Sequence, residues 1–209
     1  MRAVLFLLTA IAVALTGAPA MAVEEPPFRL VAREAGFEIR DYPTLTVAEV
    51  TVDGSRAQAA NRGFRPLAGY IFGGNRPGAK IAMTAPVLTS PASRGGEKIA
   101  MTAPVLQSPL DADSWVVRFV MPQGYTLANL PTPDDPRVRL VETPARRVAV
   151  ARFTGLWDEA GLARKSAQLE TAMRAAGLAP AGPPSFAFYD PPWTPPFLRR
   201  NEIMTPIAP

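Results

Sequence analysis

The sequence contains no histidine and no cysteine among its 209 residues. Without histidine, the chain lacks the one side chain whose unperturbed pKa lies between pH 5 and 8, so the usual general base near neutral pH is absent. The two absences together exclude Ser-His and Cys-His nucleophile pairs, and zinc sites built from thiolates or imidazoles. Disulfides are excluded too, so packing has to stabilise the fold without them.

Close pairs of carboxylates are scarce. The pair in a loop is Asp134-Asp135, and the prolines on both sides of it in "PTPDDP" are typical of a turn. Three glutamates in expected strands, Glu49, Glu142 and Glu202, have no partner in the sequence pattern that would raise their pKa into a working range. An enzyme, such as a hydrolase using glutamate or tyrosine, is therefore disfavoured, and we predict no catalytic residue.

Strong charge of one sign is also lacking. The formal net charge is +4 at pH 7 and the pI is about 9.8, which partly reflects the absence of histidine. The cations are scattered along the chain, which does not indicate a nucleic-acid-binding surface. They would favour an anionic small molecule where a few of them converge on one pocket.

The only long apolar run stands at the start of the chain. Residues 1–22 have one cation, Arg2, then "AVLFLLTAIAVALTG", then Ala20-Met21-Ala22, which is the order of a secretory signal peptide. A retained membrane anchor is the alternative, but the run is short of the about 20 apolar residues that a bilayer span needs. We expect cleavage after Ala22 and a periplasmic or secreted protein; 209 minus 22 leaves 187 residues, 23–209, for one domain.

Hydrophobic periodicity predicts a mixture of strands and two helices. The expected helices cover residues 55–71 and 156–176, the second with Leu162, Leu169 and Met173 on its apolar side. The expected strands cover residues 37–40, 45–52, 115–121, 138–142, 147–153, 185–189 and 202–207.

In the first expected helix, four apolar residues fall on one face: Ala60, Phe64, Leu67 and Ile71. Ser55 is placed to cap its start, and Gly73-Gly74 to end it. Pro66 lies inside it, so we expect a kink or a break near residues 62–63.

The order strand-strand-helix-strand-strand thus occurs twice, in pseudo-repeat halves of about 28–125 and 136–209. We predict an α+β fold in which two similar halves join their strands in one curved sheet or distorted, largely antiparallel barrel, with two flanking helices.

The nonapeptide "KIAMTAPVL" occurs twice, at 80–88 and 98–106. Its period of two predicts a hairpin of two like strands, although Pro86 and Pro104 lack an amide donor and confine each strand to an edge or a bulge. Two identical strands could also compete for one place in the sheet. Met83 and Met101 could ligate a haem iron or fill apolar gaps, and with no partner histidine we favour packing.

Seven segments together resemble the SOUL family of haem-binding proteins: "GFEIRDYP", "NRGFRPLAGYIFGGN", the doubled "KIAMTAPV", "WVVRFVMP", "YTLANLPTPDDPRVRL", "VAVARFTG" and "NEIM". The resemblance covers the chain from about Phe28 onward. It implies a distorted barrel of two halves with two flanking helices, akin to GyrI-type effector-binding domains. It also implies a tetrapyrrole ligand, haem or metal-free porphyrin, beside the first helix.

Carried onto this sequence, the resemblance implies a site around residues 62–70 and the start of the following strand. Apolar contacts would come from Phe64, Leu67, Tyr70, Ile71 and Met83, although helical spacing of this kind is also typical of an ordinary core. Cations for the propionates would come from Arg62, Arg65 and Lys80, with Arg76 close in sequence, because guanidinium groups pair with carboxylates bidentately.

The absence of histidine departs from the axial ligand proposed for some members of this family. Iron ligation would have to come from tyrosine (Tyr42, Tyr70 or Tyr189), methionine or lysine, or be absent. We therefore expect hydrophobic binding of the porphyrin without histidine ligation, in an exported carrier or buffer of tetrapyrroles. A binding module for another amphipathic anion, such as a lipid or an envelope metabolite, is the alternative.

Overall fold

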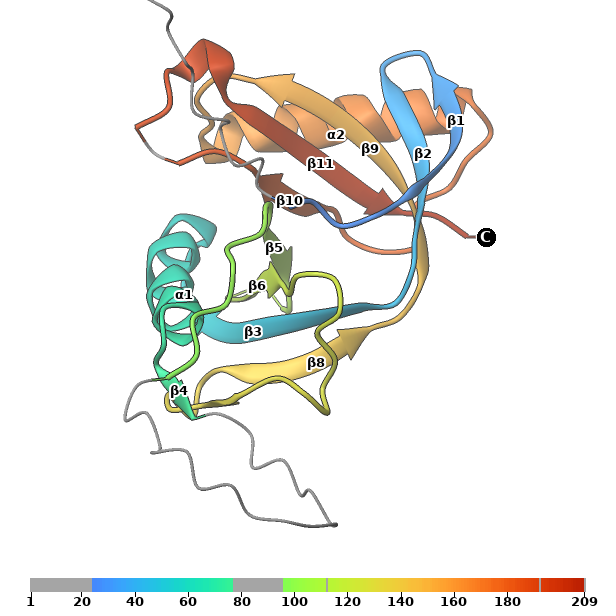
Figure 1. Ribbon diagram of the computed structural model, residues 1–209. Coiled ribbons are helices and arrows are strands. Elements are labelled where there is room, and N and C mark those ends of the chain that lie inside the picture. Colours follow the sequence, from blue (N-terminus) through green and yellow to red (C-terminus); the bar gives the residue numbers. More distant parts are fainter. Residues whose placement is uncertain (1–23, 77–95, 112, 192, 209) are drawn as a thin grey trace, which may run out of the picture.

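The computed structural model describes residues 24–76, 96–111, 113–191 and 193–208 (Figure 1). The described residues form one curled, nine-stranded antiparallel sheet in the order β1-β2-β9-β11-β10-β5-β6-β3-β8, flanked by the helices α1 and α2. Helix α1 packs on β3 and β6, and α2 packs on β9 and β11. The predicted α+β class is confirmed. The sheet is open, with β1 and β8 at its edges, and the expected signal peptide lies outside the described residues.

Apart from β1, β4 and β7, which the sequence did not predict, the strands and the two long helices follow the predicted order, strand-strand-helix-strand-strand, twice along the chain. The strands of the large sheet are β1 (Arg29–Glu34), β2 (Phe37–Tyr42), β3 (Leu45–Asp53), β5 (Val105–Pro109), β6 (Ser114–Val120), β8 (Arg139–Thr143), β9 (Arg146–Thr154), β10 (Ser185–Phe188) and β11 (Arg200–Pro206). The helices are α1 (Arg56–Ile71), α2 (Glu159–Ala175) and the 3-10 turn η1 (Pro196–Leu198). A separate pair joins β4 (Asn75–Arg76) to β7 (Thr132–Pro133).

Both ends of α1 form as the sequence predicts. The Ser55 hydroxyl accepts a hydrogen bond from the Gln58 amide, and the Gln58 side chain accepts one from the Ser55 amide, which makes a capping box. The helix ends at Ile71, and Gly73 follows with a φ of +106° that favours glycine. Of the kink or break predicted near residues 62–63, the break is wrong, since α1 continues through Pro66 to Ile71.

The buried face of α1 includes the predicted Leu67 and Ile71 but differs from the prediction by one residue in the first half of the helix. Ala59 and Gly63 face the sheet, whereas Phe64 is 40% exposed. Gly63 is the cause, because a Cβ atom there would lie 2.6 Å from Cγ2 of Val117 in β6. Glycine lets the helix approach the sheet at this point, so the helix is seated on Gly63 rather than on the larger Phe64.

The sheet separates two kinds of core. Alternate residues of its strands pack under α1 or under α2, and the rest line its concave face. In β9, for example, Ala149 lies under α2, while Val148 and Val150 lie on the concave face. The concave cluster draws on both ends of the sheet, with Leu45 and Val47 from β3 packed in it as well.

Only a small part of the repeated nonapeptide forms a strand in the described residues. Its first copy lies outside the described residues; of the second, Val105 and Leu106 belong to β5 and residues 98–101 have no regular structure. The predicted strand is therefore wrong for residues 98–104, and so is its place at an edge, because β5 pairs with β10 on one side and β6 on the other. Strand β5 begins just after Pro104, so the missing amide donor falls outside the ladder. Met101 is 45% exposed, which makes core packing wrong for this methionine.

The repeat is longer than nine residues, with one difference. Residues 80–91 read "KIAMTAPVLTSP" and residues 98–109 read "KIAMTAPVLQSP", so Gln107 in β5 corresponds to Thr89. Gln107 is buried at 2% exposure and accepts a hydrogen bond from Nη1 of Arg56 at 3.3 Å. The side chain that distinguishes the copies therefore makes a buried polar contact.

Candidate functional site

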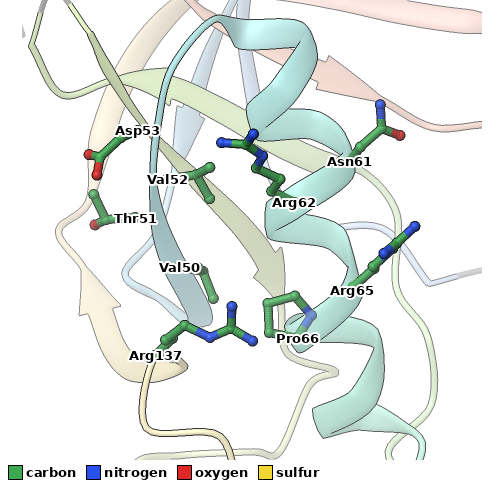
Figure 2. A pocket seen from close by; sticks show the side chains of 9 residues that line it. All are labelled: Val50, Thr51, Val52, Asp53, Asn61, Arg62, Arg65, Pro66 and Arg137. Carbon is green, nitrogen blue, oxygen red and sulfur yellow. The ribbon is translucent and has the colours of Figure 1, made fainter.

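A groove of about 550 Å³ runs between α1 and the end of β3 (Figure 2). Its lining residues come from β3, from the outer side of α1 and from the loop before β8. They are Val50, Thr51, Val52, Asp53, Asn61, Arg62, Arg65, Pro66 and Arg137.

The groove exists because β8 is shorter than β3. The β3–β8 ladder stops at the pair Glu49–Arg139, so Val50–Asp53 has a strand partner on one side only, β6, among the described strands. The chain reaches β8 through Arg137, which places this side chain at the end of the ladder, opposite α1. A short β8 thus leaves a gap between strand and helix with a cation at its mouth.

Three arginines from two elements line this groove. Arg62 and Arg65 make no hydrogen bond or ion pair with the described part of the chain. Arg137 donates to Asp135, with Nη2 at 2.6 Å from Oδ2, and this contact holds the pKa of Asp135 below its usual range. Figure 2 shows the side chains of Arg62 and Arg137 extending into the space between β3 and α1, whereas Arg65 extends from the outer side of the helix.

A second groove of about 270 Å³ continues along α1. It shares Arg65, Pro66 and Arg137 with the first and reaches Asp134. Nε of Arg76 lies 3.1 Å from Oδ1 of Asp134, so this cation, which the sequence placed near the site, is already paired. The uncompensated positive charge therefore stays with the first groove.

The predicted apolar residues of α1 lie beneath the helix, not in the groove. Leu67, Tyr70 and Ile71 are 0–1% exposed, and the Tyr70 hydroxyl donates to the backbone oxygen of Pro131 at 2.9 Å. None of the three lines the first groove, and only Tyr70 reaches the wall of the second. Of the two interpretations that helical spacing allowed, the structure supports a core for these three side chains, and the predicted ligand-facing role is corrected accordingly.

Phe64 is exposed but lies on the other flank of α1. It stands two residues from Arg62, about 200° around an α-helix, and packs edge-on against Phe119 with the ring centres 5.4 Å apart. The structure therefore brings Arg62 and Arg65 together and leaves Phe64 apart from them. Lys80 and Met83, the other predicted site residues, lie outside the described residues.

The sequence did not indicate Arg137, Val50, Val52 or Asp53 as site residues. Their position depends on the pairing of β3 with β8, and a single sequence carries no direct signal for such a long-range register. The alternation in β3 predicts that Val50 and Val52 share a face, but not that this face is left open beside α1.

None of the residues lining the first groove is a tyrosine, methionine or lysine that could ligate iron. Of the three candidate tyrosinates, Tyr42 and Tyr70 are buried and Tyr189 is half-buried, and burial raises the pKa of each hydroxyl. They therefore stay protonated near neutral pH. In the described ranges no group of three or more acidic side chains is arranged to hold a metal ion.

Comparison with known proteins gives one family match. The model of the family described as SOUL heme-binding protein matches residues 23–95 and 90–206, so it covers nearly the whole chain in two overlapping regions. The overlap, residues 90–95, falls between the two copies of the nonapeptide. No curated protein matches the chain.

Solved structures resemble the chain in fold alone. The C-terminal domain of EcmrR has a TM-score of 0.55 at 11% identity, covering 87% of this chain and 98% of that one. An uncharacterized conserved protein from Listeria innocua has a TM-score of 0.55 at 14% identity, covering 85% and 94%. A protein described as a hydrolase from Listeria innocua has a TM-score of 0.50 at 15% identity, with the same coverage. Within the described residues, no helix is long and apolar enough to cross a membrane.

Proposed function

Because the chain belongs to the SOUL heme-binding family, we propose that it binds a tetrapyrrole in the groove between α1 and β3, with arginines pairing the propionates. The observation that carries this proposal is that Arg62 and Arg137 extend into one groove with Arg65 at its rim, and that Arg62 and Arg65 have no partner among the described residues.

The groove fits such a ligand in size and chemistry. Its volume of about 550 Å³ lies within the ~300–1,000 Å³ of typical small-molecule sites. Val50, Val52 and Pro66 supply apolar wall, and guanidinium groups are suited to bidentate contacts with carboxylates. Asp53 is the one carboxylate among the lining residues and disfavours a third anionic group at that end.

The lining residues supply no axial ligand, and the chain has no histidine. Binding then rests on the carboxylates and the apolar macrocycle, which haemin and metal-free protoporphyrin IX share. The protein should accept both with similar affinity. Iron-dependent redox chemistry gains no protein ligand at this groove.

A paired titration tests the proposal. Residues 23–209 are titrated with haemin and with protoporphyrin IX, followed by absorbance and tryptophan quenching. We expect Kd values within about threefold of each other, and an increase of about tenfold in both for Arg62→Ala with Arg65→Ala, since each lost charged contact is worth ~1 kcal/mol or less at an exposed site. Arg174→Ala, an exposed arginine at the end of α2 paired with Glu170, is the matched control.

Two results contradict the proposal. One is that neither porphyrin binds with a Kd below about 10 μM, a range useful for ligand capture. The other is that the double arginine variant binds both porphyrins as the wild type does.

Polar groove residues such as Thr51 and Asn61 also suit another amphipathic anion. If such an anion is the ligand, native mass spectrometry of protein purified from its own compartment should show a co-purified ligand other than a porphyrin.

We further propose that the protein is exported and acts there as a tetrapyrrole carrier or buffer. The support is the leader pattern of residues 1–22. Cell fractionation followed by amino-terminal sequencing of the purified protein tests it. The expected mature protein begins at Val23; a protein that keeps Met1 in the cytoplasmic fraction contradicts export.

A further inference from the structure

The first described residues cross the opening of the concave face of the sheet. We call Glu24–Phe28 the strap. At its start, the backbone oxygen of Glu24 accepts a hydrogen bond from the Ala103 amide at 2.9 Å, and the Glu24 carboxylate accepts one from the Gln123 amide at 2.7 Å. These contacts hold the strap to the segments that flank β5 and β6.

The rest of the strap contacts the other side of the opening. The Glu25 carboxylate lies 2.8 and 2.9 Å from Nη1 of Arg200 in β11. The Phe28 ring lies under the guanidinium of Arg40, 4.4 Å from its centre, and beside the Tyr42 ring, with the centres 5.6 Å apart. The strap thus presents one aromatic ring and one carboxylate to the concave face.

Beneath the strap lies a cleft lined from both ends of the sheet. Apart from strap residues its walls are Tyr42, Leu45, Pro104, Leu106, Arg146, Tyr189 and Met204. With the strap in place the cleft retains about 10 Å³, no more than one water molecule requires. Open grooves of about 310 and 410 Å³ flank the strap, so it lies in a trough wider than itself.

One cation in the cleft lacks a partner. The Arg146 side chain makes no hydrogen bond or ion pair with the described part of the chain, and its Nε is fully buried. Burial, and then the like charge of Arg118, lower the pKa of Arg146. Neighbouring Arg40 and Arg200, by contrast, share the buried carboxylate of Glu202. An unpaired guanidinium next to apolar and aromatic walls is suited to pair with an anion that carries an aromatic ring.

We propose that this cleft is a second binding site, for a small aromatic carboxylate, and that the strap fills it as an internal substitute. The ligand ring would take the place of Phe28 against Arg40 and Tyr42, and its carboxylate would pair with Arg146 or with the Arg200 guanidinium that Glu25 releases. The inference is independent of the tetrapyrrole groove, because Leu45 lines the cleft on one face of β3 while Val50 and Val52 line the groove on the other.

Calorimetric titration with 2-naphthoate tests the site, with the neutral 2-naphthalenemethanol as the matched ligand. Releasing the strap with Glu25→Gln and Phe28→Ala should tighten naphthoate binding about tenfold. The reason is that the strap occupies the site in most molecules, and the apparent Kd equals the intrinsic Kd divided by the fraction of molecules in which the site is open. Arg146→Met in that background should weaken naphthoate at least tenfold and change the neutral compound less than twofold. Glu25→Gln alone, at an exposed position, should tighten binding in the same direction.

Hydrogen exchange tests whether naphthoate displaces the strap from the cleft. Saturating naphthoate should speed exchange of the Ala103 amide, which donates to the strap, in the wild-type protein. Equal naphthoate affinity in the wild type and in both strap variants overturns the proposal. So does an affinity that Arg146→Met leaves unchanged while Arg62→Ala weakens it, because the ligand then lies in the α1 groove. Circular dichroism of each variant confirms that it is folded.

Discussion

Replacing Gln107 by threonine gives the second copy of the repeat the sequence of the first over twelve residues, 98–109 against 80–91. In the wild type, Gln107 satisfies Arg56, the first residue of α1, which is 2% exposed. The same guanidinium donates to Glu159 at the start of α2, at 3.0 and 3.2 Å, and lies 4.1 Å from the centre of the Trp157 ring. Arg56 thus joins the two helices through β5.

Threonine is too short to replace the amide oxygen of Gln107. The lost hydrogen bond involves a charged donor, for which ~1.5–3 kcal/mol is typical. At 3.3 Å the hydrogen bond is long, so we take the lower end of this energy range. The preference of threonine for strands stabilises the variant by only about a few tenths of a kcal/mol. We therefore expect Gln107→Thr to lower the free energy of unfolding by about 1.5 kcal/mol.

Urea unfolding followed by tryptophan fluorescence measures this loss, and a double-mutant cycle isolates its cause. In an Arg56→Met background, Gln107→Thr should cost less than about 0.5 kcal/mol, because the donor is gone. Gln107→Glu, which keeps an acceptor at the same reach, should be closer to the wild type than Gln107→Thr. A loss of the same size with and without Arg56 refutes the reasoning and assigns the effect to strand packing.

Three further outcomes follow from buried or close contacts. Glu202→Gln leaves two arginines beside an uncharged buried side chain and should lower the free energy of unfolding by about 3 kcal/mol in urea, as when one partner of a buried ion pair is removed; a loss below 1 kcal/mol contradicts this. Hydrogen bonds from Arg147, the larger contributor, and from Arg29 lower the pKa of Asp41 to about 2. The Asp41 carboxylate therefore stabilises the fold fully above its unfolded pKa near 4, and this stabilisation is lost as the pH falls toward 2. The difference in Tm between the wild type and Asp41→Asn should shrink over that pH range, and a difference that stays constant contradicts this prediction. Gly63→Ala should lower the free energy of unfolding by about 1–3 kcal/mol through overpacking against β6, measured by thermal unfolding, whereas a neutral result shows that the helix can shift.

Local structure was predictable where a local pattern determines it. The Ser55 cap, the glycine after α1 and the buried Leu162, Leu169 and Met173 of α2 all follow from short-range chemistry and helical spacing. The seat of α1 was not predictable, because it depends on how closely Gly63 approaches a strand distant in sequence. The period of two in the repeat likewise did not make a strand of residues 98–101.

The candidate site was predictable only in its cations on α1. Arg62 and Arg65 line the groove, but Leu67 and Tyr70 do not, because core packing and ligand binding require the same apolar spacing on a helix. Arg137 reaches the groove through the β3–β8 register, which nothing near it in the sequence specifies. The sequence did not predict the contacts between segments that lie far apart in the chain.

The short β8 also has a consequence for the colloidal behaviour of the protein. Beyond Glu49, β3 presents backbone amides and carbonyls along an edge without a neighbouring strand in the described sheet, and such edges can pair with those of another molecule. Asp53, Arg62 and Arg137 stand around this edge, and their charges repel or misalign an incoming strand. Ligand-free protein in high salt, where these charges are screened, should therefore self-associate first, and a molecule that fills the groove should keep the protein monomeric by covering the edge.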